Sequence, residues 1–343
     1  MLRSKKPLAL LAGISFILVS AFIVVPFGTA SDSSKAGAKA SKPVIGLIIL
    51  GRRNEQGFYN DMYRGTVLGA KKIGAKVVVV DHAPTVPQQQ LQAFKNLINA
   101  GSKFIIVDGS LVTSAVAAAK LYPDVEFSTY LAPLPQKLPN LHGYNPSQAH
   151  QGYVLGVLAA TITKTKSVAF LGGFPDLPGN QAEGGYKLGV SAKDSSVKYA
   201  KTFVGSYSDP VKARQLASAQ IANGADVVHG YVDTGLDGLL QAAKAASKPV
   251  AVFSAGGGRC GRSPLMAADA TLPTVEIMQV MVRQWTTKKL PPGVQALTYV
   301  NFQKPLHVKL CNKYDTPALR KVVLETETKL HNKTVAIPDK LVG

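Results

Sequence analysis

The chain of 343 residues is poor in cysteine, tryptophan and acidic residues. Two cysteines are too few for a zinc site with the usual cysteine and histidine ligands, and the six histidines show no metal-binding spacing. The Gly-x-Ser-x-Gly motif of α/β-hydrolases is absent, and no histidine stands out as the partner of a catalytic cysteine. The sequence therefore favours no enzyme class, no metal site and no cofactor.

Acidic residues are scarce beside basic ones, with 20 Asp and Glu against 39 Lys and Arg and a net charge of +19. A nucleic-acid-binding protein would cluster its basic residues and interleave them with aromatic ones. Here the basic residues are spread over most of the length, without a helix-turn-helix pattern or a basic arm. We therefore expect a basic, solvated surface and no nucleic-acid partner, with non-specific attraction to anionic membranes as a side effect.

One apolar run approaches the length that spans a bilayer, and it lies at the N-terminus, at Pro7–Val25. Basic residues precede this run, and the small residues Gly28-Thr29-Ala30 follow it. This pattern predicts a secretory signal peptide over residues 1–30, with a mature chain that begins near Ser31. A retained membrane anchor is the alternative interpretation.

Residues 31–42 are rich in Ser, Ala, Lys and Gly, which is the composition of a flexible linker. No cysteine lies near the expected cleavage point, so the sequence does not predict a lipoprotein. We expect the protein to be exported across the inner membrane to the periplasm.

From Lys42 onwards, short apolar runs alternate with helix-like segments. Near-continuous valine, as in residues 77–80, indicates strands that are covered on both faces, hence parallel sheets. The expected strands are Val44–Leu50, Lys76–Val80, Phe104–Asp108, Val125–Tyr130, Leu141–Tyr144, 168–171, 198–204, 226–230, 249–254, Thr298–Phe302 and Leu306–Leu310.

Two of these strands are followed by a similar sequence pattern. The stretch Ser167–Val190 is an apolar run, a glycine turn and a helix with glycines four residues apart, at Gly185 and Gly189. Residues 44–69 repeat this pattern, which predicts two similar α/β lobes. We expect the small face of each helix to lie close on its sheet. The predicted lobes are 43–149, completed by part of 273–310, and 150–272, completed by part of 311–343.

The loop Gly256–Gly261 fits the pattern G-x-G-x-x-G, but Pro264 follows too soon for the helix that a dinucleotide site needs. We therefore interpret it as an ordinary loop. Cys260 lies in this loop, and Cys311 is the other cysteine. In an oxidising compartment an even pair predicts one disulfide, and two unpaired thiols are the alternative.

Open α/β sheets bind ligands beyond the carboxyl ends of their strands. Polar and aromatic residues follow the predicted strands in both lobes, and their shared position favours one ligand site. The candidate ligand-binding residues are Asn54, Phe58, Asn60, Asp108, Gly109, Phe174, Tyr207, Asp233, Thr234 and Ser254.

Several separated segments resemble one known family. They are LPNLHGYNPSQAHQGYVLGVLAATITKTKSVAFLGG (138–173), GSYSDPVKARQLASAQIANGADVV (205–228), YPDVEF (122–127), TGLDGLLQAAK (234–244) and VAIP (335–338). The chain resembles, over about Lys42 to Leu341, the basic membrane protein family, the purine-nucleoside-receptor-like solute-binding partners of ABC transporters. The resemblance implies a type I periplasmic-binding fold, in which two doubly wound lobes joined by a hinge enclose the ligand.

The resemblance also implies that Phe58 stacks on a nucleobase and that Asn60 follows as a polar contact. Two acids that help to hold a ribose in the family are absent, because Ile49-Leu50 and Ser254-Ala255-Gly256 stand in their places. We therefore expect a monomeric binding protein for a nucleoside or nucleobase that docks on an ABC permease. A ligand sensor of the same fold that feeds a signalling receptor, or a binder of a non-nucleoside small molecule, is the alternative.

Overall fold

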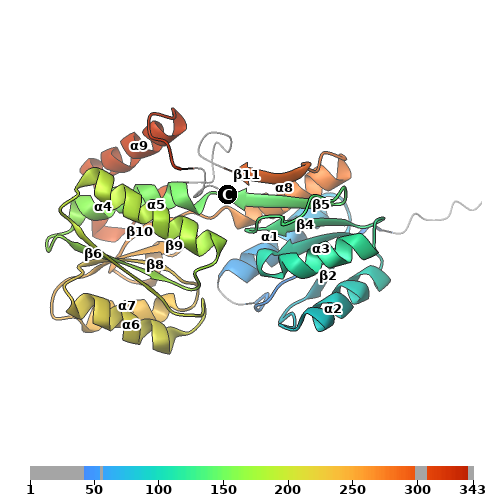
Figure 1. Cartoon of the computed structure of the whole chain (residues 1–343), viewed down its shortest axis with the longest axis horizontal. Helices are drawn as coiled ribbons and strands as arrows, with labels where there is room; N and C mark the ends of the chain where they lie inside the picture. The colour runs from blue at the N-terminus through green and yellow to red at the C-terminus, as the bar shows by residue number, and fades with distance from the viewer. Residues whose placement is uncertain (1–41, 55–56, 298–306, 339–343) are drawn as a thin grey trace, which may run out of the picture. The chain divides into compact units, whose positions relative to one another are not determined.

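The computed structural model describes residues 42–54, 57–297 and 307–338. The expected signal peptide, nearly all of the expected linker and the strand expected over Thr298–Phe302 lie outside these residues. Within them, the elements form two six-stranded sheets with helices on both faces (Figure 1). Both sheets belong to one compact unit, Lys42–Gly343.

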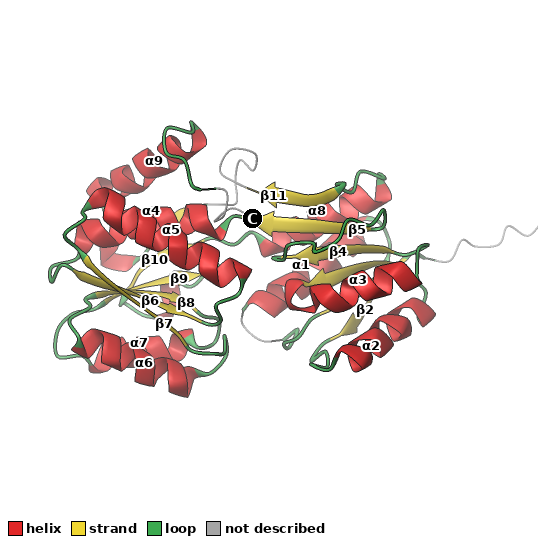
Figure 2. Ribbon diagram, in the orientation of Figure 1, coloured by secondary structure: helices red, strands yellow, loops and turns green. Residues whose placement is uncertain are grey.

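The first sheet is entirely parallel, with the strand order β2-β1-β3-β4-β5-β11. Helices α1 and α8 pack together on it, as do α2 and α3 (Figure 2). Its elements are β1 (Val44–Ile48), α1 (Phe58–Lys72), β2 (Lys76–Val80), α2 (Pro87–Asn99), β3 (Ser102–Asp108), the short 3-10 helix η1 (Gly109–Leu111), α3 (Val112–Leu121), β4 (Glu126–Tyr130), β5 (Leu141–Pro146), α8 (Thr274–Thr286) and β11 (Gly293–Leu297).

The second sheet has the order β7-β6-β8-β9-β10-β12, and only β12 runs antiparallel to its neighbour. Helices α4 and α5 cover one face, α6 and α7 cover the other, and α9 packs against α4. Its elements are α4 (Gln148–Ile162), β6 (Ser167–Gly172), α5 (Leu177–Lys193), β7 (Lys198–Phe203), α6 (Pro210–Ala222), β8 (Val227–Tyr231), α7 (Leu236–Ala245), β9 (Ala251–Ala255), the 3-10 helix η2 (Cys260–Arg262), β10 (Met266–Ala270), β12 (Val308–Leu310), the 3-10 helix η3 (Asn312–Tyr314) and α9 (Pro317–His331).

The predicted class, two doubly wound parallel α/β sheets, is confirmed. The sequence patterns missed β10 and β11, because Met-Ala-Ala-Asp-Ala and Gly-Val-Gln-Ala-Leu contain few of the β-branched residues that mark a strand. The chain passes from the first sheet to the second between β5 and α4, and it returns between β10 and α8. The strands on either side of residues 298–306 again belong to different sheets.

The glycines four residues apart pack against a helix and not against the sheet, so that expectation is wrong. An ideal Cβ at Gly185 would lie 2.1 Å from the carbonyl oxygen of Ala149, and one at Gly189 would lie 2.1 Å from that of Tyr153. Both carbonyls belong to α4. Glycine therefore sets the separation of α4 and α5, because any side chain at these positions would meet backbone.

Replacing a glycine of this helix pair should destabilise the protein. At Gly156 an added Cβ would lie 2.1 Å from the carbonyl oxygen of Tyr186. Overpacking of this kind costs about 1–3 kcal/mol, which outweighs the gain of about 1 kcal/mol in helix propensity. We expect Gly156→Ala to lower the free energy of unfolding in urea by that net amount. The control is Gly261→Ala, where no heavy atom lies within 4 Å of the added Cβ. Equal stability of the two variants would contradict this account.

A second buried feature, His229 on β8, makes stability depend on pH. Its ring lies 5.3 Å from those of Phe170 and Tyr186, and its Nδ1 has no partner among the described residues. Burial lowers the pKa of His229 to about 3 from the ordinary 6.5, and it lowers that of His150 to about 4. The folded protein therefore excludes protons that the unfolded chain takes up below pH 6.5.

The free energy of unfolding should consequently fall as the pH decreases from 6.5 towards 3. His229 alone accounts for about 2 kcal/mol of loss between pH 7 and pH 5. His229→Phe should flatten this slope, because the substitution removes the group that the folded protein keeps neutral. Urea titrations at a series of pH values measure the effect. An unchanged slope in His229→Phe would rule out the buried histidine as its source.

Candidate functional site

A cavity of about 340 Å³ lies at the carboxyl ends of strands from both sheets. This is the position at which open α/β sheets bind ligands. The walls are mostly apolar or aromatic, with a few charged groups. The lining residues are Phe58, Tyr59, Asp108, Gly109, Ser110, Val112, Leu131, Ala132, Pro133, Asp176, Leu177, Pro178, Tyr207, Tyr231, Val232, Asp233, Ala255, Gly256, Arg259 and Leu272.

Aromatic rings line the cavity from both sheets. On the side of the first sheet, Phe58 stacks on the buried Tyr130, with ring centroids 5.7 Å apart and planes 11° apart. The ring of Tyr59 lies edge-on to that of Phe58, with centroids 5.2 Å apart. On the side of the second sheet, Tyr207 lies edge-on to Tyr231 at 6.2 Å. A flat ring between these surfaces would find the offset or edge-on contacts that aromatic groups prefer.

Asp108 lines the cavity, but backbone groups engage both of its oxygens. Oδ2 accepts from the N–H of Leu50 at 3.1 Å, and Oδ1 accepts from the N–H of Ser110 at 3.0 Å. Burial raises the pKa of Asp108, and these hydrogen bonds counteract the rise. The carboxylate therefore joins the end of β1 to the start of η1, which shapes the cavity wall.

Asp176, at the start of α5 beside the second sheet, also accepts hydrogen bonds from the protein at both of its oxygens. It caps α5 by accepting from the N–H of Gly179 at 3.0 Å, and both of its oxygens accept from the Tyr207 hydroxyl, at 2.8 and 2.9 Å. Burial raises the pKa of Asp176. The N-cap thus also orients an aromatic ring of the cavity.

Arg259 is the cation of the cavity lining. Its Nη2 donates to Asp233 Oδ1 at 2.6 Å, and its Nη1 donates to the carbonyls of Val232 and Asp233 at 3.0 and 3.3 Å. The two side chains are only 7% and 10% exposed. The Arg259 backbone N–H donates to Asp269 Oδ2 at 2.8 Å, and Ser254 Oγ donates to Asp269 Oδ1 at 2.7 Å. This network fixes the guanidinium against the end of β8.

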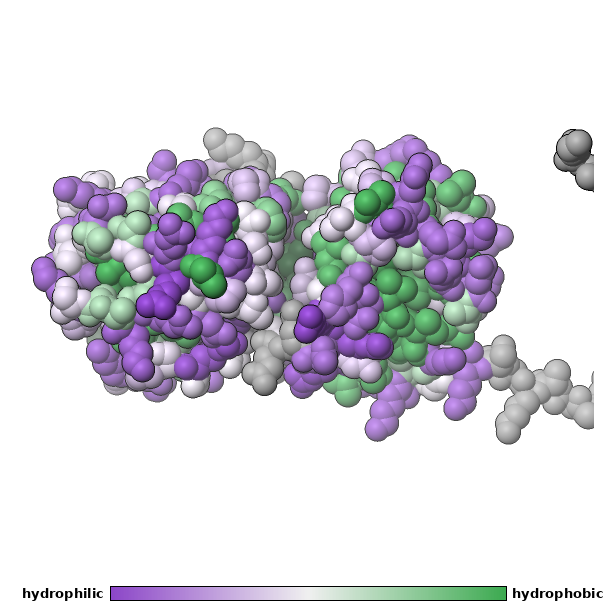
Figure 3. Space-filling view, turned by 90° about the horizontal axis from the view of Figure 1, so that it is seen from below, coloured by the Kyte–Doolittle hydropathy of each residue, from purple (hydrophilic) through white to green (hydrophobic). Residues whose placement is uncertain are grey.

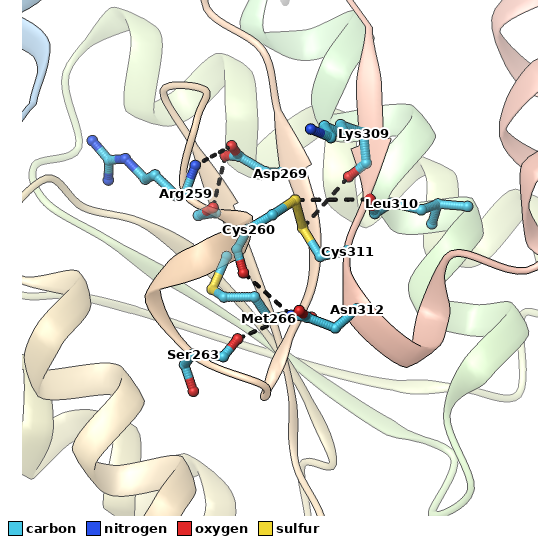
Figure 4. The surroundings of a disulfide bond; sticks show 10 residues. Arg259, Cys260, Ser263, Met266, Asp269, Lys309, Leu310, Cys311 and Asn312 are labelled. Carbon is cyan, nitrogen blue, oxygen red and sulfur yellow. Dashed lines mark hydrogen bonds between the residues drawn. A yellow bond between two sulfur atoms is a disulfide. The ribbon is translucent and has the colours of Figure 1, made fainter.

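The loop that carries Arg259 has two further constraints. Gly256, Gly257 and Gly258 have φ values of 127°, 83° and 74°, in the left-handed region that favours glycine. Directly after Arg259, the predicted disulfide Cys260–Cys311 is confirmed, with Cα atoms 5.1 Å apart (Figure 4). Residues 256–262 form a loop and a 3-10 turn, as expected for a chain without a dinucleotide-binding helix here.

Five of the ten predicted site residues line the cavity: Phe58, Asp108, Gly109, Tyr207 and Asp233. Phe174 lies beside Tyr207 but is 42% exposed, and Thr234 lies outside the lining. Ser254 is buried below it, on Asp269. Asn54 and Asn60 line a separate recess with Arg52, Arg53, Tyr63, Asp81 and His82.

Sequence analysis missed Tyr59, Tyr231 and Arg259 as lining residues. Tyr59 follows the predicted Phe58 directly, and Tyr231 ends β8 two residues before the predicted Asp233, so their places near strand ends could have indicated them. Arg259 had no such indication, because its place depends on the glycine loop and the disulfide. Among the described residues, no group of three His, Cys, Asp or Glu side chains is arranged to hold a metal ion.

The profile of one protein family, described as "ABC transporter substrate-binding protein PnrA-like", matches residues 42–252. This match covers more than half of the chain. The chain belongs to the Bmp family. The predicted family is confirmed, although the match ends before Arg259 and the disulfide loop. Bmp proteins are extracytoplasmic substrate-binding proteins.

Curated relatives of this Bmp protein share modest identity. Basic membrane protein A of Borreliella afzelii is 24% identical over 217 residues, which is 62% of this chain and 66% of the relative. A nucleoside-binding protein of an ABC transporter, BmpA of Lactococcus lactis, is 29% identical over 159 residues, 46% of this chain and 43% of the relative. A purine-binding protein of Brucella abortus is 27% identical over 144 residues, 42% of this chain and 41% of the relative. The chain thus spans less than two thirds of the first relative's length and less than half of the length of the other two.

Solved structures show that the fold is the type I periplasmic-binding fold. An ABC transporter solute-binding protein from Aeropyrum pernix superposes with a TM-score of 0.74 at 14% identity, covering 87% of this chain and 93% of that one. A solute-binding protein of Actinobacillus succinogenes with bound D-allose gives 0.63 at 17% identity, covering 79% and 98%. Among the described residues, no helix combines the length and apolar character needed to cross a membrane.

Asp108 should be required for stability because both of its oxygens accept backbone hydrogen bonds. Asp108→Asn keeps the shape but leaves one N–H, of Leu50 or Ser110, facing an amide NH₂ group. An unsatisfied buried donor costs about 1–3 kcal/mol, which we expect as the loss in the free energy of unfolding in urea. The control is Asp124→Asn at an exposed position, expected to change little. Equal stability of Asp108→Asn and the parent protein would show that these bonds contribute nothing.

Proposed function

We propose that this Bmp protein is the solute-binding component of an ABC importer and that it binds a small ring-containing ligand, a nucleoside or nucleobase. The observation that carries the proposal is the aromatic platform of Phe58 in a cavity lined from both sheets. The names of two relatives, a nucleoside-binding and a purine-binding protein, support this ligand class.

The cavity favours contacts with a ring over contacts with a ribose. Phe58 offers a flat apolar face, and the oxygens of Asp108 and Asp176 already accept hydrogen bonds from the protein. Neither the end of β1 nor Ser254, which is buried on Asp269, offers the carboxylates that the family uses for the sugar. Discrimination should therefore depend mainly on the ring.

Binding rather than catalysis is the mechanism that these residues support. A ligand that contacts Phe58 on one sheet and Tyr207 on the other stabilises the conformation in which both surfaces are close. The chain crossings between the sheets allow such a hinge motion. The closed form would then dock on a membrane permease, and the N-terminal signal sequence would deliver the protein to the periplasm.

The affinity for purines should depend on Phe58. Stacking on one aromatic ring contributes about 1–3 kcal/mol per base, so Phe58→Ala should weaken adenosine or adenine binding by roughly 5- to 150-fold. Isothermal titration calorimetry with adenosine, guanosine, their free bases, sugars and amino acids measures this. Tyr314→Ala is the control, because that ring belongs to η3 and lies outside the cavity lining.

Small-angle scattering at saturating ligand should show a smaller radius of gyration, and mass spectrometry should recover the ligand unchanged. Tight binding of a non-aromatic sugar or amino acid, with Phe58→Ala harmless, would refute the ligand class. An unchanged scattering curve would refute the closure.

A further inference from the structure

The charged groups of the cavity have the opposite balance from the rest of the chain. The whole sequence has 39 basic and 20 acidic residues. On the face shown in Figure 3, hydrophilic side chains are scattered over the surface. The cavity lining has three carboxylates, Asp108, Asp176 and Asp233, and a single cation, Arg259. A ligand entering the cavity therefore meets an excess of negative charge.

Arg259 is the one cationic side chain of this lining and would attract an anion. A guanidinium offers five N–H donors and is the preferred partner of phosphate and carboxylate groups. Here it is 7% exposed, and Asp233 Oδ1 at 2.6 Å neutralises it. Its other hydrogen bonds are to the carbonyls of Val232 and Asp233, which carry no net charge. Asp233 is thus the one carboxylate that hydrogen-bonds to this guanidinium among the described residues, while Asp61 interacts with it electrostatically without such a bond.

Asp233 is also held from the first sheet. An ideal Cβ on Gly57 would lie 2.4 Å from Asp233 Oδ1 and 2.8 Å from Oδ2, so backbone at the start of α1 approaches the carboxylate closely. Helix α1 has no side-chain cap at this end, and helix N-termini favour negative charge. Asp233 Oδ2 is buried and has no hydrogen-bond partner among the described residues. This oxygen leaves an acceptor for a donor group on the ligand.

We propose that Asp233 determines charge specificity: it occupies Arg259, excludes anionic ligands and selects uncharged or cationic rings that present an N–H or O–H donor. The ring preference rests on the proposed function, and the charge preference rests on the ion pair alone. Specificity here comes from a repulsive element as much as from attraction. An anionic ligand would also lie beside the carboxylates of Asp108 and Asp176, which repel like charge.

The test compares adenosine with adenosine 5′-monophosphate, which differ by one phosphate. In the parent protein we expect the nucleotide to bind at least about 100-fold more weakly. Asp233→Asn exposes the cation and should reduce this ratio to below about tenfold. The double variant Asp233→Asn, Arg259→Met removes the cation and should restore a large ratio. Calorimetry gives the affinities, and circular dichroism confirms folding.

A matched control exists in the same region of the second sheet. Arg262 Nη2 and Asp237 Oδ1 form another pair at 2.6 Å, but both side chains are more exposed and neither lines the cavity. Asp237→Asn removes the same charge and should keep the ratio of the parent protein. If Asp233→Asn does not fold, Arg259→Gln tests the opposite sign, because the cavity then gains negative charge and the ratio should widen at least about threefold.

Inorganic phosphate separates this inference from the proposed function. If neither adenosine nor adenine binds the parent protein, the proposed function fails. The charge inference then stands if phosphate raises the melting temperature of Asp233→Asn but not of Asp237→Asn. It is overturned if the parent protein binds the nucleotide as tightly as adenosine, or if folded Asp233→Asn gains no affinity for either anion.

Discussion

The buried ion pair between Arg259 and Asp233 is the interaction on which the wall of the cavity depends. A buried charge without a partner costs several kcal/mol, so each member needs the other in place. The pair lies where β8 and β9 end, and its backbone anchor, Asp269, belongs to β10. Groups at three neighbouring strands therefore hold Arg259, Asp233 by the guanidinium and Asp269 by the backbone N–H, and the cavity wall between them is fixed by charge as well as by packing.

The two sheets differ in the direction of their last edge strand. The first ends in the parallel strand β11, whereas the second ends in the antiparallel β12, which the disulfide joins to the Arg259 loop. Asn312 reinforces that junction by donating to the carbonyls of Cys260, Ser263 and Met266 (Figure 4). The C-terminal strands β11 and β12 thus complete the two sheets, and the disulfide after β12 holds the loop that carries Arg259.

Much of the fold could be predicted because apolar runs such as Phe104–Val107 are buried and mark strands directly. Phe58, Asp108, Tyr207 and Asp233 could be predicted as lining residues because they closely follow strands or, for Phe58, begin the first helix. Asn60 could not be placed, because its amide donates to the Arg53 carbonyl and the side chain faces another recess. Arg259 could not be placed either, since three left-handed glycines and a bond to a distant cysteine decide where it points.

Because Gly57 approaches Asp233 closely, the size of the side chain at residue 57 affects the separation of the two sheets. No Cβ fits between the start of α1 and the carboxylate while Asp233 keeps its position. A side chain at this position would act as a wedge between the two sheets, and its volume would set how far apart they rest. A series of substitutions of increasing size at residue 57 would therefore yield graded, partly open forms of the protein, from which the energetic cost of opening could be read.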